Sequence, residues 1–327
     1  MKQEKKRIYW IDAIKALCIF SVMISHGQFS QSQIRVDYFF LVGFFFASGY
    51  VFNEEYSFRK RCCKIVDGLY IPYLIMPFIM FFFIKNNLCE LINGDSLEVL
   101  KREILKCITG HSWFLQVLIS IEFIYVIWIK FVKIHKVWLF LICLSLYMGG
   151  VLNQANWPWR IHIAFYGLLF FIIGIWMKSA IFKFPILRKS TIIIMVILFI
   201  MLSDIVFPKY PFNTSLSQFN NVIILFVMNI VGIIVLYYVS SIIPQSKYID
   251  YLGQNSLVIY FIHIPFVYYI YQLLLSWTKD TWIDNTFSAV IYTFFITLIL
   301  YPIVVLLNKY AAILVGKGKL TEKKLLK

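Results

Sequence analysis

Three ionisable residues in the first apolar segment of the chain have the types and spacing for acid–base chemistry. Asp12, Lys15 and His26 lie in a run whose other residues are mostly apolar. Asp12 and Lys15 are three positions apart and Lys15 and His26 are eleven apart, so on a helix all three point to roughly the same side. An imidazole has an ordinary pKa of about 6.5 and can take a proton from a sugar hydroxyl near neutral pH. The pattern predicts a general base at His26.

A structural interpretation of the same stripe stays open. In it, Asp12 and Lys15 only neutralise each other and His26 lies at an interface between helices. A charge at the centre of a bilayer costs at least about 2.5–3.5 kcal/mol on insertion scales, which favours a functional reason for keeping such residues. Lys15 and His26 are separated by roughly 16 Å along a helix axis, so the stripe links a cation near one surface to an imidazole near the other.

Ten apolar segments must position these residues. Of the 327 residues 61% are apolar and only 14% are charged, whereas a soluble domain has about 45–50% and 25%. The apolar blocks are long enough to cross the hydrocarbon region of a bilayer. We expect an all-α, polytopic membrane helix bundle with about ten spans, near 8–28, 36–53, 68–84, 113–130, 137–152, 161–178, 190–207, 221–243, 254–275 and 286–308.

The distribution of basic residues gives the bundle a direction. The net charge is +15, but Lys and Arg lie between the apolar segments and form no basic face with interleaved aromatics, which argues against nucleic-acid binding. With both termini in the cytoplasm, 22 of the 31 basic residues fall inside and 8 outside, in agreement with the positive-inside rule. We expect one membrane domain over 1–327, with an uncleaved first helix after a tail at 1–7 and a basic cytoplasmic tail at 309–327.

Other candidate residues are more isolated. Glu122 lies inside the fourth span, where it can pair with a cation or orient a histidine, and His263 lies within the ninth span. Trp113 begins the fourth span, a position that an interfacial anchor also occupies. The basic run from Arg59 to Lys64 anchors a cytoplasmic end and could hold anionic phosphates.

The outer loop at 85–112 carries two further predictions. Its stretch from Ser96 to Ile108 is amphipathic and is typical of a helix lying on the membrane surface. Cys89 and Cys107 share this loop and could pair in an oxidising space. No motif for ATP hydrolysis and no zinc-binding pattern is present, so we expect neither a metal site nor a tightly bound cofactor.

Six segments, taken in order, resemble the acyltransferase 3 family of membrane-bound O-acyltransferases that modify surface carbohydrates. The first is the helix from Ile11 to Ser25-His26 and the second is the Phe-rich span ending in Ser48-Gly-Tyr50. The others are the basic run that leads to Pro72-Tyr73, Ser112-Trp-Phe-Leu115, Phe170-Phe-Ile-Ile-Gly174 and the run from Leu252 to His263. The resemblance covers nearly the whole chain.

The resemblance implies roles for individual residues. The essential histidine of the family corresponds to His26, and a late-helix histidine corresponds to His263. Lys15 stands where the family frequently has Arg, and the family's Arg-x-x-Arg pattern corresponds to Arg61 and Lys64. A lysine keeps the positive charge but loses the bidentate geometry with which arginine binds phosphate.

The predicted function is therefore transfer of an acetyl group from cytoplasmic acetyl-CoA to a hydroxyl of a capsule, O-antigen or exopolysaccharide sugar. We expect a bacterial cytoplasmic membrane location, a glycan acceptor that is either lipid-linked or free, and association with polysaccharide assembly proteins. His26 would act as general base or carry the acyl group, Arg61, Lys64 and Lys15 would hold the CoA, and Asp12 would fix Lys15. The alternatives are a transporter or flippase for a lipid-linked sugar, with the charged residues as a proton relay, and a purely structural partner in a polysaccharide synthesis complex.

Overall fold

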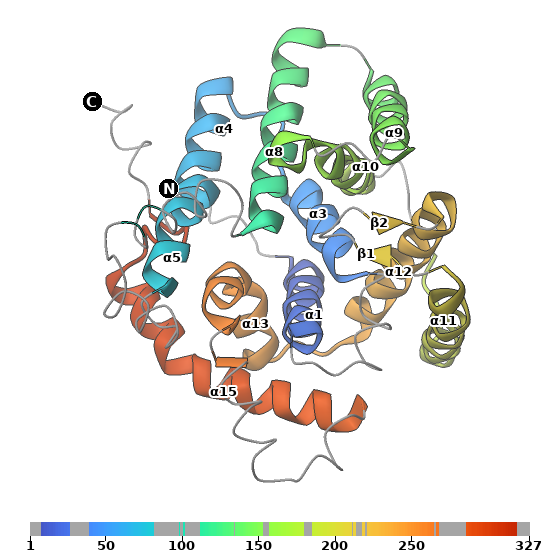
Figure 1. The fold of residues 1–327 in the computed structure, drawn as a ribbon. Helices are drawn as coiled ribbons and strands as arrows, with labels where there is room; N and C mark the ends of the chain where they lie inside the picture. The colour runs from blue at the N-terminus through green and yellow to red at the C-terminus, as the bar shows by residue number, and fades with distance from the viewer. Residues whose placement is uncertain are drawn as a thin grey trace.

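The computed structural model describes eleven α-helices that pack into a bundle (Figure 1). The residues described are 8–26, 39–81, 98, 101, 112–133, 135–152, 157–179, 185–210, 212–213, 218–219, 221–264, 266–267 and 286–318. The first half comprises α1 (Tyr9–His26), α3 (Phe40–Val51), α4 (Phe58–Ile65), the π-helical turn η1 (Val66–Tyr70), α5 (Ile71–Phe81), α8 (Trp113–Ile127) and η2 (Trp128–Val132). The second comprises α9 (Lys136–Leu152), the 3₁₀ turn η3 (Pro158–Arg160), α10 (Ile161–Lys178), α11 (Lys189–Lys209), α12 (Val222–Ile242), α13 (Lys247–Gln254) and α15 (Thr286–Tyr310).

Seven helical segments are long and apolar enough to cross a membrane, and two shorter apolar helices, Phe40–Val51 and Lys136–Met148, accompany them among the described residues. Residues 256–264 are also helical and lie within the predicted ninth span, 254–275. The chain is thus an all-α polytopic membrane protein, as its sequence predicts. The predicted surface helix from Ser96 to Ile108 and the Cys89–Cys107 pair lie essentially outside the described residues.

The third span begins ten residues earlier than the sequence predicts. Hydropathy places its start at residue 68, but one helical segment runs from Phe58 to Ile79. Ser57 caps it by accepting a hydrogen bond from the backbone N–H of Lys60, and the segment continues through η1 into α5. The basic run is therefore the opening two turns of a helix and not a loop, because Arg61 and Ile65 bury one face while the other basic side chains stay exposed.

A small departure from the all-helical prediction lies between α11 and α12. The two-residue strands β1 (Phe212–Asn213) and β2 (Gln218–Phe219) pair antiparallel, with Phe212 opposite Phe219 and Asn213 opposite Gln218. This hairpin satisfies backbone groups at the end of a span and leaves the bundle unchanged.

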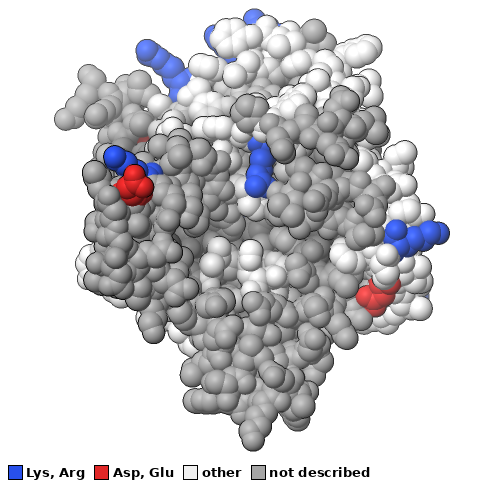
Figure 2. Space-filling model, in the orientation of Figure 1, with Lys and Arg blue, Asp and Glu red and all other residues white. Residues whose placement is uncertain are grey.

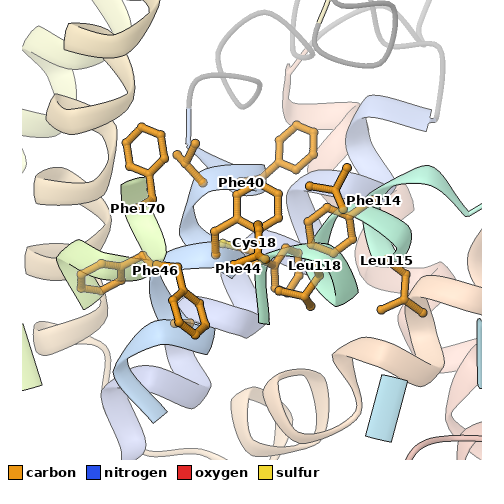
Figure 3. Packing of buried hydrophobic residues seen from close by; sticks show 14 of the residues in the cluster. Cys18, Phe40, Phe44, Phe46, Phe114, Leu115, Leu118 and Phe170 are labelled. Carbon is orange, nitrogen blue, oxygen red and sulfur yellow. The ribbon is translucent and has the colours of Figure 1, made fainter. Parts of the chain in front are cut away.

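The core is built from phenylalanines of several helices. Figure 3 shows Phe44 and Phe46 of α3, Phe114 of α8 and Phe170 of α10 gathered together with smaller apolar side chains from α1 and α8. The helices α3 and α10 approach closely, since a Cβ added at Gly49 would overlap the carbonyl oxygen of Phe171. Small residues at such crossings let helix backbones pack without a hydrophobic driving force between them.

The outer surface of the bundle suits lipid. Figure 1 shows α1 and α3 in the middle with other helices around them. The peripheral helix α11 exposes Ile193, Ile197 and Ile205, and α15 exposes Phe295 and Leu306. On the face seen in Figure 2, charged side chains of the described residues occupy only a few separate positions. Such an apolar exterior would be unstable in water and is expected in a bilayer.

Candidate active site

Two histidines that are far apart in the sequence meet at one end of the bundle. His26 is the last residue of α1 and His263 lies near the end of the helical residues 256–264. The centres of their rings are 5.2 Å apart, and the ring planes are inclined by 52°. The side chain of His26 is exposed, whereas that of His263 is fully buried. One accessible imidazole thus lies against one that the protein encloses.

The surroundings of His263 define which of its ring nitrogens carries the proton. Its Nδ1 lies 3.1 Å from the carbonyl oxygen of Ile259 and 2.8 Å from that of Tyr260. Carbonyl oxygens only accept hydrogen bonds, so Nδ1 must be the protonated nitrogen. The buried Nε2 is then an acceptor, and it has no hydrogen-bond partner among the described residues. His263 can therefore accept a hydrogen bond from a donor in the site, with the neighbouring His26 the nearest described candidate.

A close contact near the start of α1 sets its spacing from the segment that leads to His263. A Cβ added at Gly253 of α13 would overlap the carbonyl oxygen of Asp12 on α1. The glycine lets the two backbones touch. From there α1 runs to His26, and beyond Asn255 the helical residues 256–264 run to His263. The backbone of Asp12 thus packs against α13 and helps to position the two histidines, while its side chain carries a carboxylate.

A second group of polar residues lines a pocket of about 170 Å³ at the ends of α3 and α4. This pocket is far along α1 and α8 from the histidine pair, on the side that the charge distribution predicts to be cytoplasmic. Arg61, Lys64 and Glu122 line it together with Asn53 and Tyr56. Three residues singled out by the sequence, from two different spans, therefore come together in one cavity.

The cations of this pocket are held by aromatic rings as well as by polar groups. The Nζ atoms of Lys60 and Lys64 each lie 4.2 Å from the centre of the Tyr56 ring. The guanidinium of Arg61, only 7% exposed, lies 5.8 Å from the Phe52 ring and donates a hydrogen bond to the carbonyl oxygen of Glu54. Cation–π contacts of this kind fix the position of a positive charge without neutralising it. The pocket can therefore attract an anionic ligand.

Lys15 connects α1 to this pocket. Its ammonium group acts electrostatically on the Glu122 carboxyl group of α8. Glu122 itself lines the pocket, so Lys15 lies towards the pocket end of α1, roughly 16 Å along the helix from His26. The sequence predicts a pairing of Lys15 with Asp12 three residues away; the structure adds an electrostatic interaction with Glu122 of another helix.

Glu54, which the sequence analysis did not identify, ties the turn beside the pocket to two further helices. Its carboxylate accepts a hydrogen bond of 2.6 Å from the Tyr125 hydroxyl and one of 2.7 Å from the ammonium group of Lys136. Burial alone would raise the pKa of Glu54, but the hydrogen bonds from Lys136 and Tyr125 and the charges of Lys136 and Arg61 outweigh it, so the pKa is lowered. The only sequence signal was an acidic pair at 54–55 just before a basic run.

Replacing Glu54 with Gln should loosen this turn and weaken binding of the acyl donor that the sequence resemblance predicts for this pocket. We expect KM for the acyl donor to rise about 3- to 10-fold, because each charge-assisted hydrogen bond is worth roughly twice a neutral one. Since the folded pKa lies below the ordinary 4.5, the stabilisation by Glu54 is present above that pH and is lost as pH falls through the folded value. The gap in melting temperature between wild type and Glu54→Gln should accordingly close in acid.

Lys136→Met provides the matched test of this arrangement. If Glu54 acts through Lys136, the double variant should bind the donor no worse than the more impaired single variant. Additive losses, or an unchanged KM in Glu54→Gln, would contradict the proposed link between this turn and the pocket.

Trp113 lies apart from the cationic pocket. It begins α8, and the guanidinium of Arg160 lies 5.5 Å from the centre of its ring. Arg160 precedes α10 in the turn η3, where Trp159 and Arg160 have φ angles of 55° and 51°. Non-glycine residues in this left-handed region cost roughly 1–3 kcal/mol each and cluster at functional sites. Nothing in the amino-acid sequence pointed to Arg160 except that it is a basic residue outside a span.

The predicted residues thus divide between two ends of the bundle. Arg61, Lys64 and Glu122 line the pocket with Lys15 nearby, whereas His26 and His263 form a pair, and Trp113 contacts Arg160. Within the described residues, no group of three His, Cys, Asp or Glu side chains could hold a metal ion.

The chain matches a known protein family over most of its length. The family described as "Acyltransferase domain", the acyltransferase 3 family, matches residues 8–306, which is most of the chain and includes both groups of polar residues. No curated protein and no solved structure gives a significant match. A match of this extent, on a polytopic helical bundle with these residues inside, establishes that the chain belongs to the acyltransferase 3 family and is a membrane acyltransferase.

Proposed function

We propose that this acyltransferase transfers an acetyl group from cytoplasmic acetyl-CoA to a hydroxyl of a cell-surface polysaccharide sugar. The acceptor class is a capsule, O-antigen or exopolysaccharide unit, and the membrane is the bacterial cytoplasmic membrane. The observation that carries this proposal is the pair of rings at His26 and His263, 5.2 Å apart. A membrane bundle has no structural need for two histidines in contact, one of them with a buried acceptor nitrogen.

In the proposed mechanism His26 is the general base. It takes the proton of the acceptor hydroxyl while the oxygen attacks the thioester carbonyl, and CoA leaves as the thiolate. Alternatively, His26 first accepts the acetyl group and then passes it to the hydroxyl. His263 would hold the His26 ring through its Nε2, in the way that a third group orients the base of a nucleophile–base pair.

The cationic pocket would bind the phosphates of the donor. Arg61 and Lys64 line a cavity whose one described carboxyl group, that of Glu122, also interacts electrostatically with Lys15. Lys15 and His26 are separated by roughly 16 Å along α1, a distance that an extended pantetheine arm can cover. The phosphates would thus stay at the predicted cytoplasmic side while the thioester reaches the histidines.

Purified protein incubated with labelled acetyl-CoA and candidate glycans tests the proposal directly. Label on the sugar is the expected outcome. Release of CoA without an acceptor would indicate hydrolysis or an acyl-enzyme. If neither label transfer nor CoA binding occurs, the proposal fails and a role in transport of a lipid-linked sugar becomes the better interpretation.

The positioning role of His263 leads to a separate expectation. His263→Phe keeps a ring in the buried site but removes the acceptor nitrogen, and we expect kcat to fall about 100-fold because small misplacements of a catalytic group have effects of that size. KM for acetyl-CoA should stay within about twofold, because His263 lies outside the cationic pocket.

His263→Gln should recover part of the lost kcat, since its amide oxygen can accept the same hydrogen bond. Equal loss in both variants, together with a lower melting temperature, would indicate that His263 only fills space.

A further inference from the structure

A cluster of aromatic and cationic side chains lies beside the histidine pair and is not used by the donor site. Tyr260 is the link, because its ring lies 6.1 Å from that of His263 and 5.5 Å from that of Phe114. Its hydroxyl hydrogen-bonds Ser112, the residue before α8. Trp113 and the turn η3 therefore lie at the same end of the bundle as His26 and His263.

This cluster contains an arginine and two tryptophans: Trp113 contacts the guanidinium of Arg160, and Trp159 precedes Arg160 in the chain. Trp159 is 40% exposed and is backed by the buried Tyr73, with ring centres 6.4 Å apart. Trp113 is half-buried and holds the guanidinium of Arg160 at 5.5 Å. Because the backbone is left-handed at both Trp159 and Arg160, these neighbouring side chains lie at the same end of the bundle as the histidine pair. An exposed indole face of this kind suits the C–H face of a sugar ring.

The guanidinium of Arg160 has an N–H group that can still donate a hydrogen bond to a ligand. Its Nη1 atom is buried and has no hydrogen-bond partner among the described residues. No carboxylate of the described residues forms a salt bridge with it, in contrast to Lys136, which is paired with Glu54. A cation placed over an indole retains its charge, and its planar fork of N–H groups matches a carboxylate or a phosphate.

We propose that this cluster is the acceptor subsite of the enzyme, in which Trp159 and Trp113 contact the sugar and Arg160 binds an anionic group of the glycan. This inference rests on the proposed O-acyl transfer to a carbohydrate and narrows the acceptor to an acidic one. The anionic group is either the carboxylate of an acidic sugar or the diphosphate of a lipid-linked saccharide. Both present the same paired oxygens to a guanidinium.

The test compares Arg160→Gln and Arg160→Lys with wild type in full-length protein. The acceptors are a glucuronate-containing oligosaccharide, a neutral oligosaccharide of equal length and a polyprenyl-diphosphate-linked sugar. For the acidic acceptor that is used, Arg160→Gln should raise KM at least about tenfold, and Arg160→Lys should raise it less. KM for acetyl-CoA and for the neutral acceptor should not change.

The matched control is Lys209→Gln. Lys209 also lies over an aromatic ring at a helix end, 5.4 Å from the centre of Tyr210, but outside this cluster. Its replacement should leave every KM unchanged. The acidic acceptor whose KM depends on Arg160 identifies the source of the anionic group. Equal effects on acidic and neutral acceptors, or no effect on either acidic acceptor, would overturn the inference.

Direct binding separates this inference from the proposed function. Quenching of tryptophan fluorescence by the glucuronate oligosaccharide and by inorganic pyrophosphate can be measured without any transfer. If wild type transfers no acetyl group but binds one of these probes at least about tenfold more tightly than Arg160→Gln, the subsite stands and the proposed reaction fails. If transfer to a glycan occurs and neither probe distinguishes the two proteins, the subsite fails and the reaction stands.

Discussion

Replacing His26 with Ala should reduce acetyl transfer by about 10²- to 10⁴-fold, the range that general acid–base catalysis contributes. The side chain is exposed at the end of α1, so its removal leaves no cavity in the core and the protein should remain folded in the membrane. The measurement is the initial rate of label transfer from acetyl-CoA to the glycan at saturating concentrations of both. KM for acetyl-CoA should stay close to that of wild type, because the donor phosphates bind elsewhere.

His135→Ala is the matched control for this variant. His135 is also an exposed histidine beside a helix end, but it precedes α9, and its Nδ1 accepts a hydrogen bond from the backbone N–H of Val137. Its replacement should leave the rate unchanged. Persistence of acetyl ester on the glycan in the His26→Ala protein, at wild-type rate, would remove His26 from the mechanism.

The His26→Ala variant also tests the alternative function, transport of a lipid-linked sugar. A proton relay through Asp12, Lys15 and His26 would make movement of a lipid-linked sugar depend on His26, whereas a transferase predicts loss of the ester bond and no change in the distribution of the lipid across the bilayer. Measuring both in reconstituted vesicles assigns the residue to one process.

Much of the helical framework was predictable from hydropathy and charge, because a span must satisfy its own backbone in lipid and therefore appears as a long apolar block. The predicted fourth and sixth spans, 113–130 and 161–178, nearly coincide with Trp113–Val132 and Ile161–Lys178. The start of the third span was missed because the polar side chains of α4 lower the hydropathy of turns that are nevertheless helical.

Within the candidate site, only the arrangement of residues that lie on one helix was predictable from the sequence. The stripe of Lys15 and His26 follows from helical periodicity, but the contact of His26 with His263 depends on how two distant segments pack. Glu54 and Arg160 gave no signal for a different reason. Their roles arise from hydrogen bonds and cation–π contacts to other helices, which a single sequence does not encode at any fixed spacing.

The packing that brings the histidines together gives the second large expected effect, at Gly253. A methyl group there would overlap the carbonyl oxygen of Asp12, and backbone atoms on both sides cannot move aside as a flexible side chain would. The α1 and α13 backbones must separate, so we expect Gly253→Ala to destabilise the fold by about 1–3 kcal/mol. The separation should also pull His26 away from His263 and reduce the transfer rate by about 100-fold.

Thermal unfolding in detergent, measured beside the transfer rate, checks both parts of this expectation. Gly68→Ala is the matched control, because the nearest atom to its new Cβ would be the carbonyl oxygen of Gly316 at 4.0 Å, an ordinary contact. That variant should keep the melting temperature and the rate of wild type. A Gly253→Ala protein that retains both would show that the contact with Asp12 does not set the distance between the helices. A protein that loses activity at an unchanged melting temperature would instead indicate that the histidine spacing is more sensitive than the fold.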